Sequence, residues 1–307
     1  MNMSVASSAG SFGDFSLPPP IIIAASSDEA RARASVMAEA AGFRAVAVSV
    51  DDAVDRLDLQ ASTSAVWLEL DRDQGLPLDL LLDRVENDVG EGHFPAIICS
   101  PLPLIDRIMS RITDPSVELL VNPSPIERAA ALALAIAVKQ SSNRLHDISG
   151  EPGVAKLRQI SDEVSRIAAT LARLSTNPAA TAIERPEPAT GEIPPVSLDV
   201  VRQVIRARRV RGRFFDETLF ADPAWDMLLD LFQAEISQHR VPVSSLCIAA
   251  AVPATTALRW IKTMTDAGHF QRRADPHDGR RVFVELSPQA SNAMRRYFAE
   301  VGKTTIV

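Results

Sequence analysis

Hydroxyl and cationic side chains gather between residues 241 and 287, and their chemistry suits contact with nucleic acid. Threonine can hydrogen-bond to bases or phosphates, and arginine can bind a guanine edge through two hydrogen bonds. Closely spaced arginines repel one another unless an anion such as a phosphate backbone lies beside them. We therefore predict a DNA-contacting set that comprises Ser244, Pro253, Thr255, Thr256, Arg259, Lys262, Thr263, Arg272, Arg273, Arg280 and Arg281.

Two short helices joined by a tight turn are predicted to hold the first part of this set. The first helix should begin at Ser244 or Ser245, whose hydroxyl can cap free backbone N–H groups. The break falls at residues 251–252. Pro253 suits the first turn of the second helix, because its missing N–H costs nothing there, and Gly268 suits the end of that helix.

The second helix has two chemically different sides. With about 3.6 residues per turn, one side is apolar and must face a core. The other side carries short hydroxyls and cations with no carboxylate, which favours a helix laid in a DNA major groove. The alternative is an ordinary solvated helix face. The predicted core-facing residues are Ala254, Ala257, Leu258, Ile261, Met264 and Thr265.

A β-hairpin is predicted directly after these helices. Residues 270–273 form one strand, and the alternating residues 282–286 form its partner. Pro276 and the pair Asp278-Gly279 lie between them and are strong turn signals. Four arginines of the predicted set therefore flank one hairpin.

This block resembles the winged helix-turn-helix domain of MarR-family transcription regulators. The family's wing pattern, Asp-x-Arg followed by an alternating strand that ends in Leu-Thr or Leu-Ser, matches residues 278–280 and 284–287. The resemblance covers about the last third of the chain. It implies that Arg280 enters the minor groove, that Asp278 holds the basic residues of the wing in place, and that the first helix of the domain belongs to a dimer interface.

The charge of the chain is divided unevenly. The formal net charge is −7 over 307 residues, a length that indicates about two domains. From Ser197 to the end, 16 Lys and Arg stand against 12 Asp and Glu, whereas the preceding residues hold 16 against 27. A mildly basic end and a clearly acidic one fit a DNA-binding end and an end that avoids DNA.

Several classes of protein are not expected. The most apolar run, residues 129–138, is about half the length of a membrane span, and no secretory signal is visible. Cys99 and Cys247 are predicted to be reduced core thiols of a cytoplasmic protein. We expect no metal site, with His269 and His277 at the surface, and no cofactor. Without a nucleophile–base set or a Gly-rich phosphate loop, we expect no enzyme.

Strands and helices alternate regularly between residues 21 and 146. The predicted strands cover residues 21–25, 45–50, 65–70, 95–100 and 117–121, and a long helix starts at Pro125. This alternation predicts an α/β domain with a doubly wound parallel five-stranded sheet. The order and lengths of the elements resemble the receiver domain of two-component response regulators.

The residues at the expected receiver pocket depart from the receiver pattern. Carboxylates that would hold Mg²⁺ are missing after the first strand, and Glu69 stands at the place of the phosphorylated Asp. Receivers also have a Lys after the fifth strand, and Asn122 replaces it here. The predicted degenerate pocket consists of Ser26, Asp28, Glu69, Asp71, Ser100 and Asn122. We expect a non-phosphorylatable pseudo-receiver that serves dimerisation or protein binding. Mimicry of a phosphorylated Asp by Glu69, and Asp71 as a substitute acceptor, stay open as alternatives.

The connecting region is predicted to hold a dimer seam. Apolar residues at spacings of 3 and 4 form a coiled-coil helix within residues 150–176, with a helix packed on its own sheet as the alternative. The seam residues are Leu157, Ile160, Val164, Ile167, Leu171 and Leu174. Residues 1–20 are predicted to be a disordered tail, 177–196 a Pro-rich linker and 197–307 the winged helix domain. The arginines of the basic helix, predicted over residues 198–215, could contact DNA phosphates or the acidic N-terminal domain.

These patterns together predict a cytoplasmic, homodimeric DNA-binding transcriptional regulator that recognises palindromic double-stranded DNA. A regulatory protein is a further expected partner of the receiver-like domain, and no membrane is expected. One alternative is a signalling adaptor that uses both domains for protein contacts and shows no salt-dependent DNA affinity. A second is a response regulator controlled by phosphorylation of Asp71.

Overall fold

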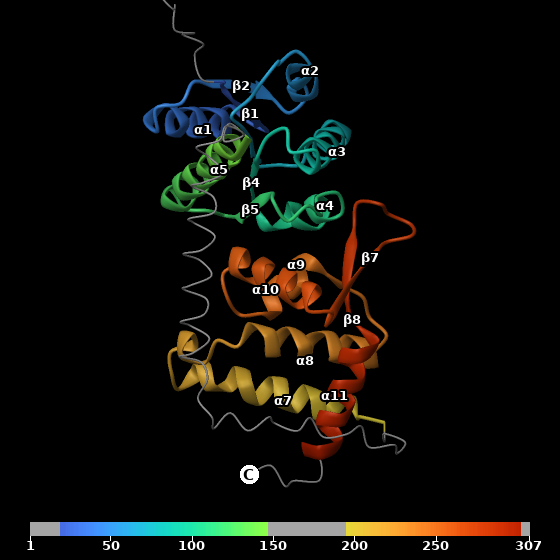
Figure 1. The fold of residues 1–307 in the computed structure, drawn as a ribbon. Helices are drawn as coiled ribbons and strands as arrows, with labels where there is room; N and C mark the ends of the chain where they lie inside the picture. Colours follow the sequence, from blue (N-terminus) through green and yellow to red (C-terminus); the bar gives the residue numbers. More distant parts are fainter. Residues whose placement is uncertain (1–18, 147–194, 302–307) are drawn as a thin grey trace, which may run out of the picture.

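The computed structural model describes residues 19–146 and 195–301. These two stretches form an α/β layer and a mainly helical layer that are stacked on each other (Figure 1). The predicted coiled-coil seam lies outside the described residues, as do nearly all of the predicted N-terminal tail and of the Pro-rich linker. The domain boundaries in those regions therefore stay predictions.

The α/β layer is built on a five-stranded parallel sheet of order β2-β1-β3-β4-β5. Strands β1, β3 and β4 are short, fully buried runs, as expected for a sheet covered on both faces, whereas β5 is half buried. The order reverses between β1 and β3, which confirms the predicted doubly wound sheet. The strands are β1 (Ile21–Ala25), β2 (Ala45–Ser49), β3 (Ala65–Glu69), β4 (Ala96–Ser100) and β5 (Glu118–Val121).

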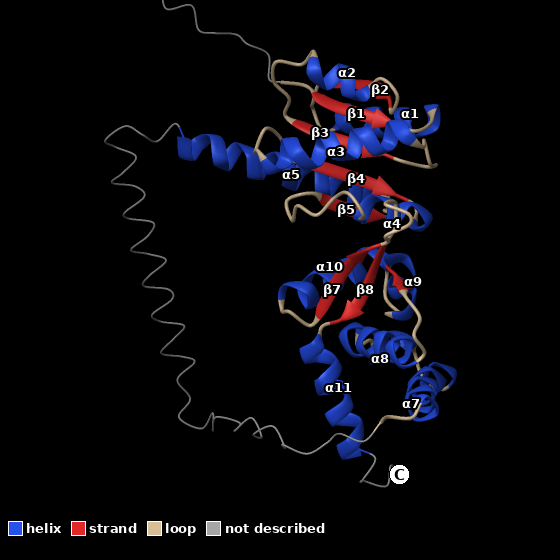
Figure 2. Ribbon diagram, turned by 90° about the vertical axis from the view of Figure 1, so that its right-hand side faces the viewer, coloured by secondary structure: helices blue, strands red, loops and turns tan. Residues whose placement is uncertain are grey.

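Helices cover both faces of the sheet (Figure 2). Successive strand residues point to opposite faces, so Ile22 and Leu68 join one hydrophobic cluster while Ile23 and Trp67 join another. The second cluster includes residues of α1 and α5, and the first includes residues of α2, α3 and α4. The helices are α1 (Asp28–Ala40), α2 (Ala53–Asp58), α3 (Leu76–Gly90), the 3₁₀ turn η1 (Leu102–Leu104), α4 (Ile105–Met109) and α5 (Pro125–His146).

The C-terminal layer surrounds one apolar core. Phe232, Leu246, Ile261 and Val284 come from four different elements and are almost completely buried together. The elements are α7 (Leu198–Val210), the 3₁₀ turns η2 (Arg211–Arg213) and η3 (Glu217–Phe220), α8 (Pro223–Ile236), β6 (Val241–Pro242), α9 (Val243–Ala249), α10 (Ala254–Asp266), β7 (Phe270–Ala274), β8 (Val282–Leu286) and α11 (Pro288–Val301). The predicted hairpin is confirmed as an antiparallel β7–β8 pair, and β6 adds a short third strand.

Helix ends follow local chemistry with three corrections. Gly268 has φ +74° directly after α10, which is the left-handed conformation that glycine favours. The predicted cap at Ser244 or Ser245 is wrong, because α9 begins at Val243 and no side chain caps it. Pro253 is the N-cap of α10 and not a residue of its first turn. The predicted helix over residues 198–215 ends as an α-helix at Val210.

The two layers meet through a continuous apolar contact. Ile105 and Met109 of α4 and Val121 of β5 belong to the same hydrophobic cluster as the core of the C-terminal layer. In both views, the β5 edge of the sheet and α4 face α9, α10 and the β7–β8 hairpin (Figures 1 and 2). One edge of the sheet therefore faces the helices that the sequence predicts to contact DNA.

No single helix among the described residues is long and apolar enough to cross a membrane. The pair α9 and α10 meets the length and composition criteria jointly, with a bend of 108° between the two helices.

Candidate nucleic-acid interface

Helix α10 separates its apolar and polar sides as predicted. Ala257, Leu258, Ile261 and Met264 are buried against the core, whereas Thr256, Arg259, Lys262 and Thr263 are exposed. The hydroxyl of Thr263 donates to the carbonyl of Arg259, one turn earlier, at 2.9 Å. The structure therefore brings the predicted cations and hydroxyls together on one helix surface.

The hairpin supplies carboxylates for its own arginines. Oδ1 of Asp278 accepts a hydrogen bond from the backbone N–H of Arg280 at 3.1 Å, and its Oδ2 lies 3.4 Å from Nε of Arg281. Arg273 pairs with Glu285 across the two strands at 2.8 Å. Arg273 and Arg281 therefore have anionic partners within the hairpin, so a phosphate backbone is not the only anion available to them. Asp278 lies close in the chain to the arginines that it holds, whereas Glu285 reaches Arg273 from the partner strand.

Arg272 differs from the other arginines of the hairpin. Its Nε is buried and makes no hydrogen bond within the described structure. Burial lowers the pKa of its guanidinium, because the charged form loses hydration, and the nearby charge of Asp266 acts in the opposite direction. This residue is therefore less available to a phosphate than the exposed Arg273 and Arg281.

Four residues of the predicted DNA-contacting set instead contact the N-terminal layer. Ser244 donates from its backbone N–H at 2.9 Å, and from its hydroxyl, to Asp106. The hydroxyl oxygen of Thr255 accepts from the backbone N–H of Val121 at 3.0 Å. The remaining two contacts are ion pairs, Arg259–Glu118 at 2.7 Å and Arg280–Asp79 at 3.4 Å. Local sequence patterns could not predict these contacts, because the partners lie more than 130 residues apart.

The two ion pairs differ in their surroundings. The Arg259 side chain is 70% exposed and that of Glu118 is 34% exposed, so solvent screens this pair to about 0–1 kcal/mol. Asp79 is only 3% exposed. The wing arginine therefore reaches a carboxylate that is withdrawn from solvent.

Asp79 belongs to a network of carboxylates and guanidiniums between α3 and α4. Arg107 donates from Nε to Asp79 at 2.7 Å and also bonds Asp73, and Arg111 pairs with Asp79 at 3.1 Å. Burial would raise the pKa of Asp79, but the hydrogen bond from Arg107 and the charges of Arg107, Arg111 and Arg280 outweigh it and hold the pKa below its usual range. The charge of Arg280 likewise contributes to lowering the pKa of Asp73.

The basic helix α7 points to a different part of the molecule. It lies on the far side of the C-terminal layer from β5 (Figure 1). Arg208 pairs with Asp226 at 2.6 Å and with Asp222 at 3.7 Å, both within the same layer. The suggestion that α7 contacts the acidic N-terminal layer is therefore wrong. The contacts with the N-terminal layer come instead from α9, α10 and the wing.

The predicted receiver pocket contains two cations that the sequence pattern did not reveal. Oε1 of Glu69 lies 2.8 Å from Arg33 on α1 and 2.9 Å from Arg128 on α5. Trp67 donates from Nε1 to Oε2 of Glu69 at 3.0 Å. The buried carboxylate of Glu69 is thus neutralised from both helices that cover this face of the sheet. Although Asn122 replaces the Lys of the receiver pattern, the pocket is not without a cation, because the packing of α1 and α5 supplies the positive charge.

The other predicted pocket residues are only partly brought together. Asp71 pairs with Arg33 at 2.7 Å and accepts from the hydroxyl of Ser27, while the hydroxyl of Ser26 accepts from the backbone N–H of Asp71. Asp28 lies outside the pocket, 90% exposed, and pairs with Arg31.

Two pocket residues at the ends of β4 and β5 have no side-chain role that the described contacts reveal. The Oγ of Ser100 is buried and makes no hydrogen bond in the described structure. Asn122 is exposed and takes φ +48°, and its backbone N–H donates to the carbonyl of Ser100. The pocket therefore holds an ion-paired carboxylate where a receiver would place its acceptor.

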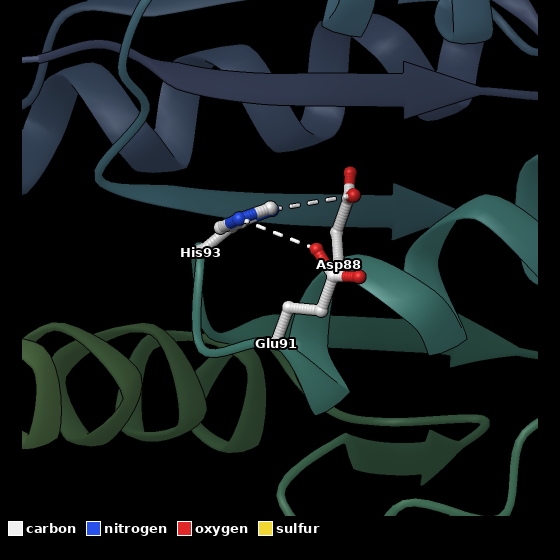
Figure 3. Close-up of side chains that lie close together, drawn as sticks. All are labelled: Asp88, Glu91 and His93. Carbon is white, nitrogen blue, oxygen red and sulfur yellow. Dashed lines mark hydrogen bonds and ion pairs between the residues drawn. The ribbon is translucent and has the colours of Figure 1, made fainter.

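A separate cluster of metal-ligand types lies at the end of α3. Nδ1 of His93 is 3.4 Å from Asp88, and its Nε2 is 3.4 Å from Glu91 (Figure 3). The two ring nitrogens thus face different carboxylates, whereas a metal would require ligand atoms to converge at about 2.0–2.2 Å. Asp88 also accepts from Arg84 at 2.7 Å. This geometry fits polar contacts of His93 with Asp88 and Glu91 at the C-terminal end of α3.

Cys99 and Cys247 are free and buried, as predicted for core thiols. Burial raises the pKa of both thiols, that of Cys247 to about 12. Neither is a reactive thiolate at neutral pH.

A family model described as a winged helix DNA-binding domain matches residues 228–290. These residues run from α8 through α9, α10 and the hairpin into α11. The comparison with curated proteins found no match.

Three solved structures are similar to about a third of the chain. A probable transcriptional regulator from Pseudomonas aeruginosa is 26% identical, with 34% of this chain and 74% of that chain covered and a TM-score of 0.22. Apo (heme-free) PefR is 17% identical, with 36% and 94% covered and a TM-score of 0.24. Transcriptional regulator Tm0710 from Thermotoga maritima is 20% identical, with 34% and 77% covered and a TM-score of 0.21. The family model, together with the helix pair and hairpin described above, shows that the chain contains a C-terminal winged helix DNA-binding domain.

Proposed function

We propose that the chain is a transcriptional regulator that binds palindromic double-stranded DNA as a homodimer through a MarR-like winged helix. The observation that carries this proposal is the winged helix match over residues 228–290, combined with an exposed α10 surface of cations and hydroxyls. A regulator of this kind acts in the cytoplasm and needs no catalytic group or cofactor.

Helix α10 is the recognition helix in this proposal. Its first two turns would enter a major groove, where Arg259 can bind a guanine edge and Thr256 can bond a base or a phosphate. The exposed cation Lys262 would contact the phosphate backbone. Arg280 at the tip of the hairpin would enter the adjoining minor groove. The hydrogen bond from the backbone of Arg280 to Asp278 supports a fixed wing conformation.

The surface of the winged helix domain supports dimerisation. Phe214, Phe215 and Leu219, between α7 and α8, are 59–74% exposed, and Phe215 stacks edge-on against Phe220 at 5.7 Å. A contiguous patch of exposed apolar side chains can mark a protein–protein contact site. Dimerisation through this region and through the predicted seam at residues 157–174 would place two recognition helices on successive half-sites.

The N-terminal domain is, in this proposal, a receiver-like module that does not accept a phosphoryl group. The strand order supports the likeness, since the same order occurs in receiver-type doubly wound sheets. Glu69, and not an aspartate, stands at the expected acceptor position, and two guanidiniums hold its carboxylate. The module would serve dimerisation or contact with a regulatory protein.

The test is binding of the full chain to genomic DNA fragments over a salt series, with Arg259→Ala and Arg280→Ala beside it. A DNA-binding protein loses affinity as salt rises, because phosphate contacts release counterions. Arg44→Ala is a matched control, since it removes one exposed positive charge from a loop of the other layer. Loss of fragment preference in Arg259→Ala but not in Arg44→Ala supports the proposal. If neither the wild type nor any variant binds DNA with an affinity that depends on the salt concentration, the proposal is contradicted.

One observation favours a second candidate function, that of a signalling adaptor. The α10 surface contacts protein in this structure, through Thr255 on Val121 and Arg259 on Glu118. An adaptor would use the same surface for protein partners and would bind no DNA at any salt concentration.

A further inference from the structure

We infer that the β5–α4 side of the N-terminal domain is a docking surface for the DNA-binding face of this chain's own winged helix, so that docking and DNA binding exclude each other. We call this surface, made of Leu102, Ile105, Asp106, Met109, Glu118 and Val121 with the adjoining Asp79, the docking surface. The inference rests on the proposed DNA-binding function.

Polar contacts tie each functional part of the winged helix to the docking surface. Asp106 accepts both hydrogen-bond donors of Ser244, at the start of the helix that precedes the turn. Thr255, in the first turn of the recognition helix, accepts from the N–H of Val121 on the edge strand. Arg259 and Arg280 pair with Glu118 and Asp79. The helix pair and the wing are therefore all engaged simultaneously.

The acceptors on the docking surface resemble those of DNA in charge. Carboxylates of Asp79, Asp106 and Glu118 stand opposite a serine N–H, a hydroxyl and two guanidiniums, which are the groups that phosphates also bind. The N-terminal stretch of the chain is acidic overall, whereas the winged helix stretch is mildly basic. Charge complementarity thus favours this docked arrangement over contact between two like-charged surfaces.

An apolar centre completes the contact. Ile105 is fully buried and Met109 and Val121 are 8% and 6% exposed, and all three share one cluster with the winged helix core. Leu102 and Leu119 pack against the same cluster. A buried apolar centre with polar contacts around it is the usual anatomy of a specific protein interface. This arrangement distinguishes the contact from a chance approach of charged side chains.

Steric exclusion follows from where the sheet edge lies. A recognition helix must place its exposed side in a groove to reach base edges. Thr255 and Arg259 lie on that side, and β5 already occupies the space in front of them. The docked chain must therefore separate from the docking surface before α10 can enter DNA. The apparent affinity for DNA is then reduced by the fraction of open molecules.

The test alters the docking surface and leaves the DNA-binding face intact. Full-length Asp106→Ala and Glu118→Lys, alone and combined, remove the acceptors of Ser244 and Arg259. Glu39→Lys is the matched control for Glu118→Lys. It makes the same charge change on an exposed residue of α1, at the far end of the sheet. Thermal unfolding checks that each variant is folded. DNA affinity is measured on the fragment that the wild type prefers, and small-angle scattering measures the radius of gyration.

We expect the double variant to bind DNA about tenfold more tightly than the wild type, with a larger radius of gyration, while Glu39→Lys changes neither. Equal DNA affinity in the wild type and the double variant overturns the inference and leaves the proposed function standing. An unchanged radius in the double variant, together with tighter binding in Glu39→Lys, also overturns it, since added charge alone then explains the gain. Failure of all variants to bind DNA overturns the inference together with the proposed function.

Discussion

The guanidinium of Arg259 lies 2.7 Å from the carboxylate of Glu118, although the two residues belong to different layers of the molecule. Arg259 stands on the exposed side of α10, where a recognition helix would meet a base. Glu118 begins β5, the edge strand of the parallel sheet. One contact thus joins the residue most suited to specific DNA recognition to the acidic domain.

Replacing Asp278 should weaken the wing without unfolding the domain. In Asp278→Ala, the backbone N–H of Arg280 loses its acceptor and Arg281 loses its partner. We expect about three- to tenfold weaker DNA binding in a background that carries Asp106→Ala and Glu118→Lys, with unfolding free energy changed by less than about 1 kcal/mol. Asp51→Ala, at an exposed loop residue, is the control. Unaltered affinity in Asp278→Ala would show that the wing needs no such support.

Removal of Glu69 should destabilise the N-terminal domain strongly. Glu69→Ala leaves Arg33 and Arg128 without their shared carboxylate and deprives the Trp67 N–H of its acceptor. Breaking a buried ion pair from one side costs about 3–5 kcal/mol. Chemical denaturation measures the loss, and Glu29→Ala, on the exposed side of α1, should change stability by less than about 0.5 kcal/mol. Equal stability of the two variants would contradict the role given to this network.

Acid should weaken the network around Asp79. Burial acts to raise the pKa values of Asp71, Asp73 and Asp79, but hydrogen bonds and arginine charges outweigh it and lower all three. The hydrogen bonds come from Ser27 and Arg33 to Asp71, from the Gly75 backbone and Arg107 to Asp73, and from Arg107 to Asp79. A carboxyl whose folded pKa is depressed stabilises the protein above its unfolded pKa, near 3.8, and loses that contribution as the pH falls through the folded pKa. We therefore expect unfolding free energy to fall steadily below about pH 4–5.

Asp79→Asn provides the check on this assignment. The variant should be less stable than the wild type at neutral pH, and its stability should change less with pH in the acid range. Denaturant titrations at several pH values below 6 would measure both slopes. Parallel pH profiles for the two proteins would contradict the assignment of acid sensitivity to Asp79.

Phosphoryl donors should leave the N-terminal domain unlabelled. Glu69 occupies the expected acceptor position, and Asp71 is held by Arg33 and by the hydroxyl of Ser27. Incubation with a small-molecule phosphoryl donor and Mg²⁺, followed by intact-mass measurement, tests this expectation. An added phosphoryl group that disappears in Asp71→Ala would establish the alternative of a phosphorylation-controlled regulator.

Sequence periodicity was sufficient to predict the strands of the parallel sheet, the helix pair and the hairpin, but not β6 or α11. Strand β3 and its neighbours follow from buried apolar runs between helical segments, and the end of α10 follows from Gly268, whose φ of +74° glycine tolerates best. The hydroxyl and cationic side of α10 follows from helical spacing alone. These features depend on residues that are close together in the chain.

Contacts between distant residues could not be predicted in this way. Arg33 and Arg128 meet Glu69 because α1 and α5 both pack on the same face of the sheet, and no local motif records that meeting. The contact between Ser244 and Asp106 requires knowing which edge of the sheet faces the winged helix. A hydroxyl that looked like a helix cap is instead used between layers.

The slope of DNA affinity against salt concentration is the most direct measure of DNA binding through α10 and the wing. It should be measured on the preferred fragment for the opened double variant, with and without Arg280→Ala, so that loss of the Asp79 contact does not obscure the result. If α10 and the wing bind DNA, affinity falls with salt, and the slope of log affinity against log salt is smaller by about one when Arg280 is removed. A slope that Arg280→Ala leaves unchanged, or affinity that does not respond to salt, would contradict DNA binding through α10 and the wing.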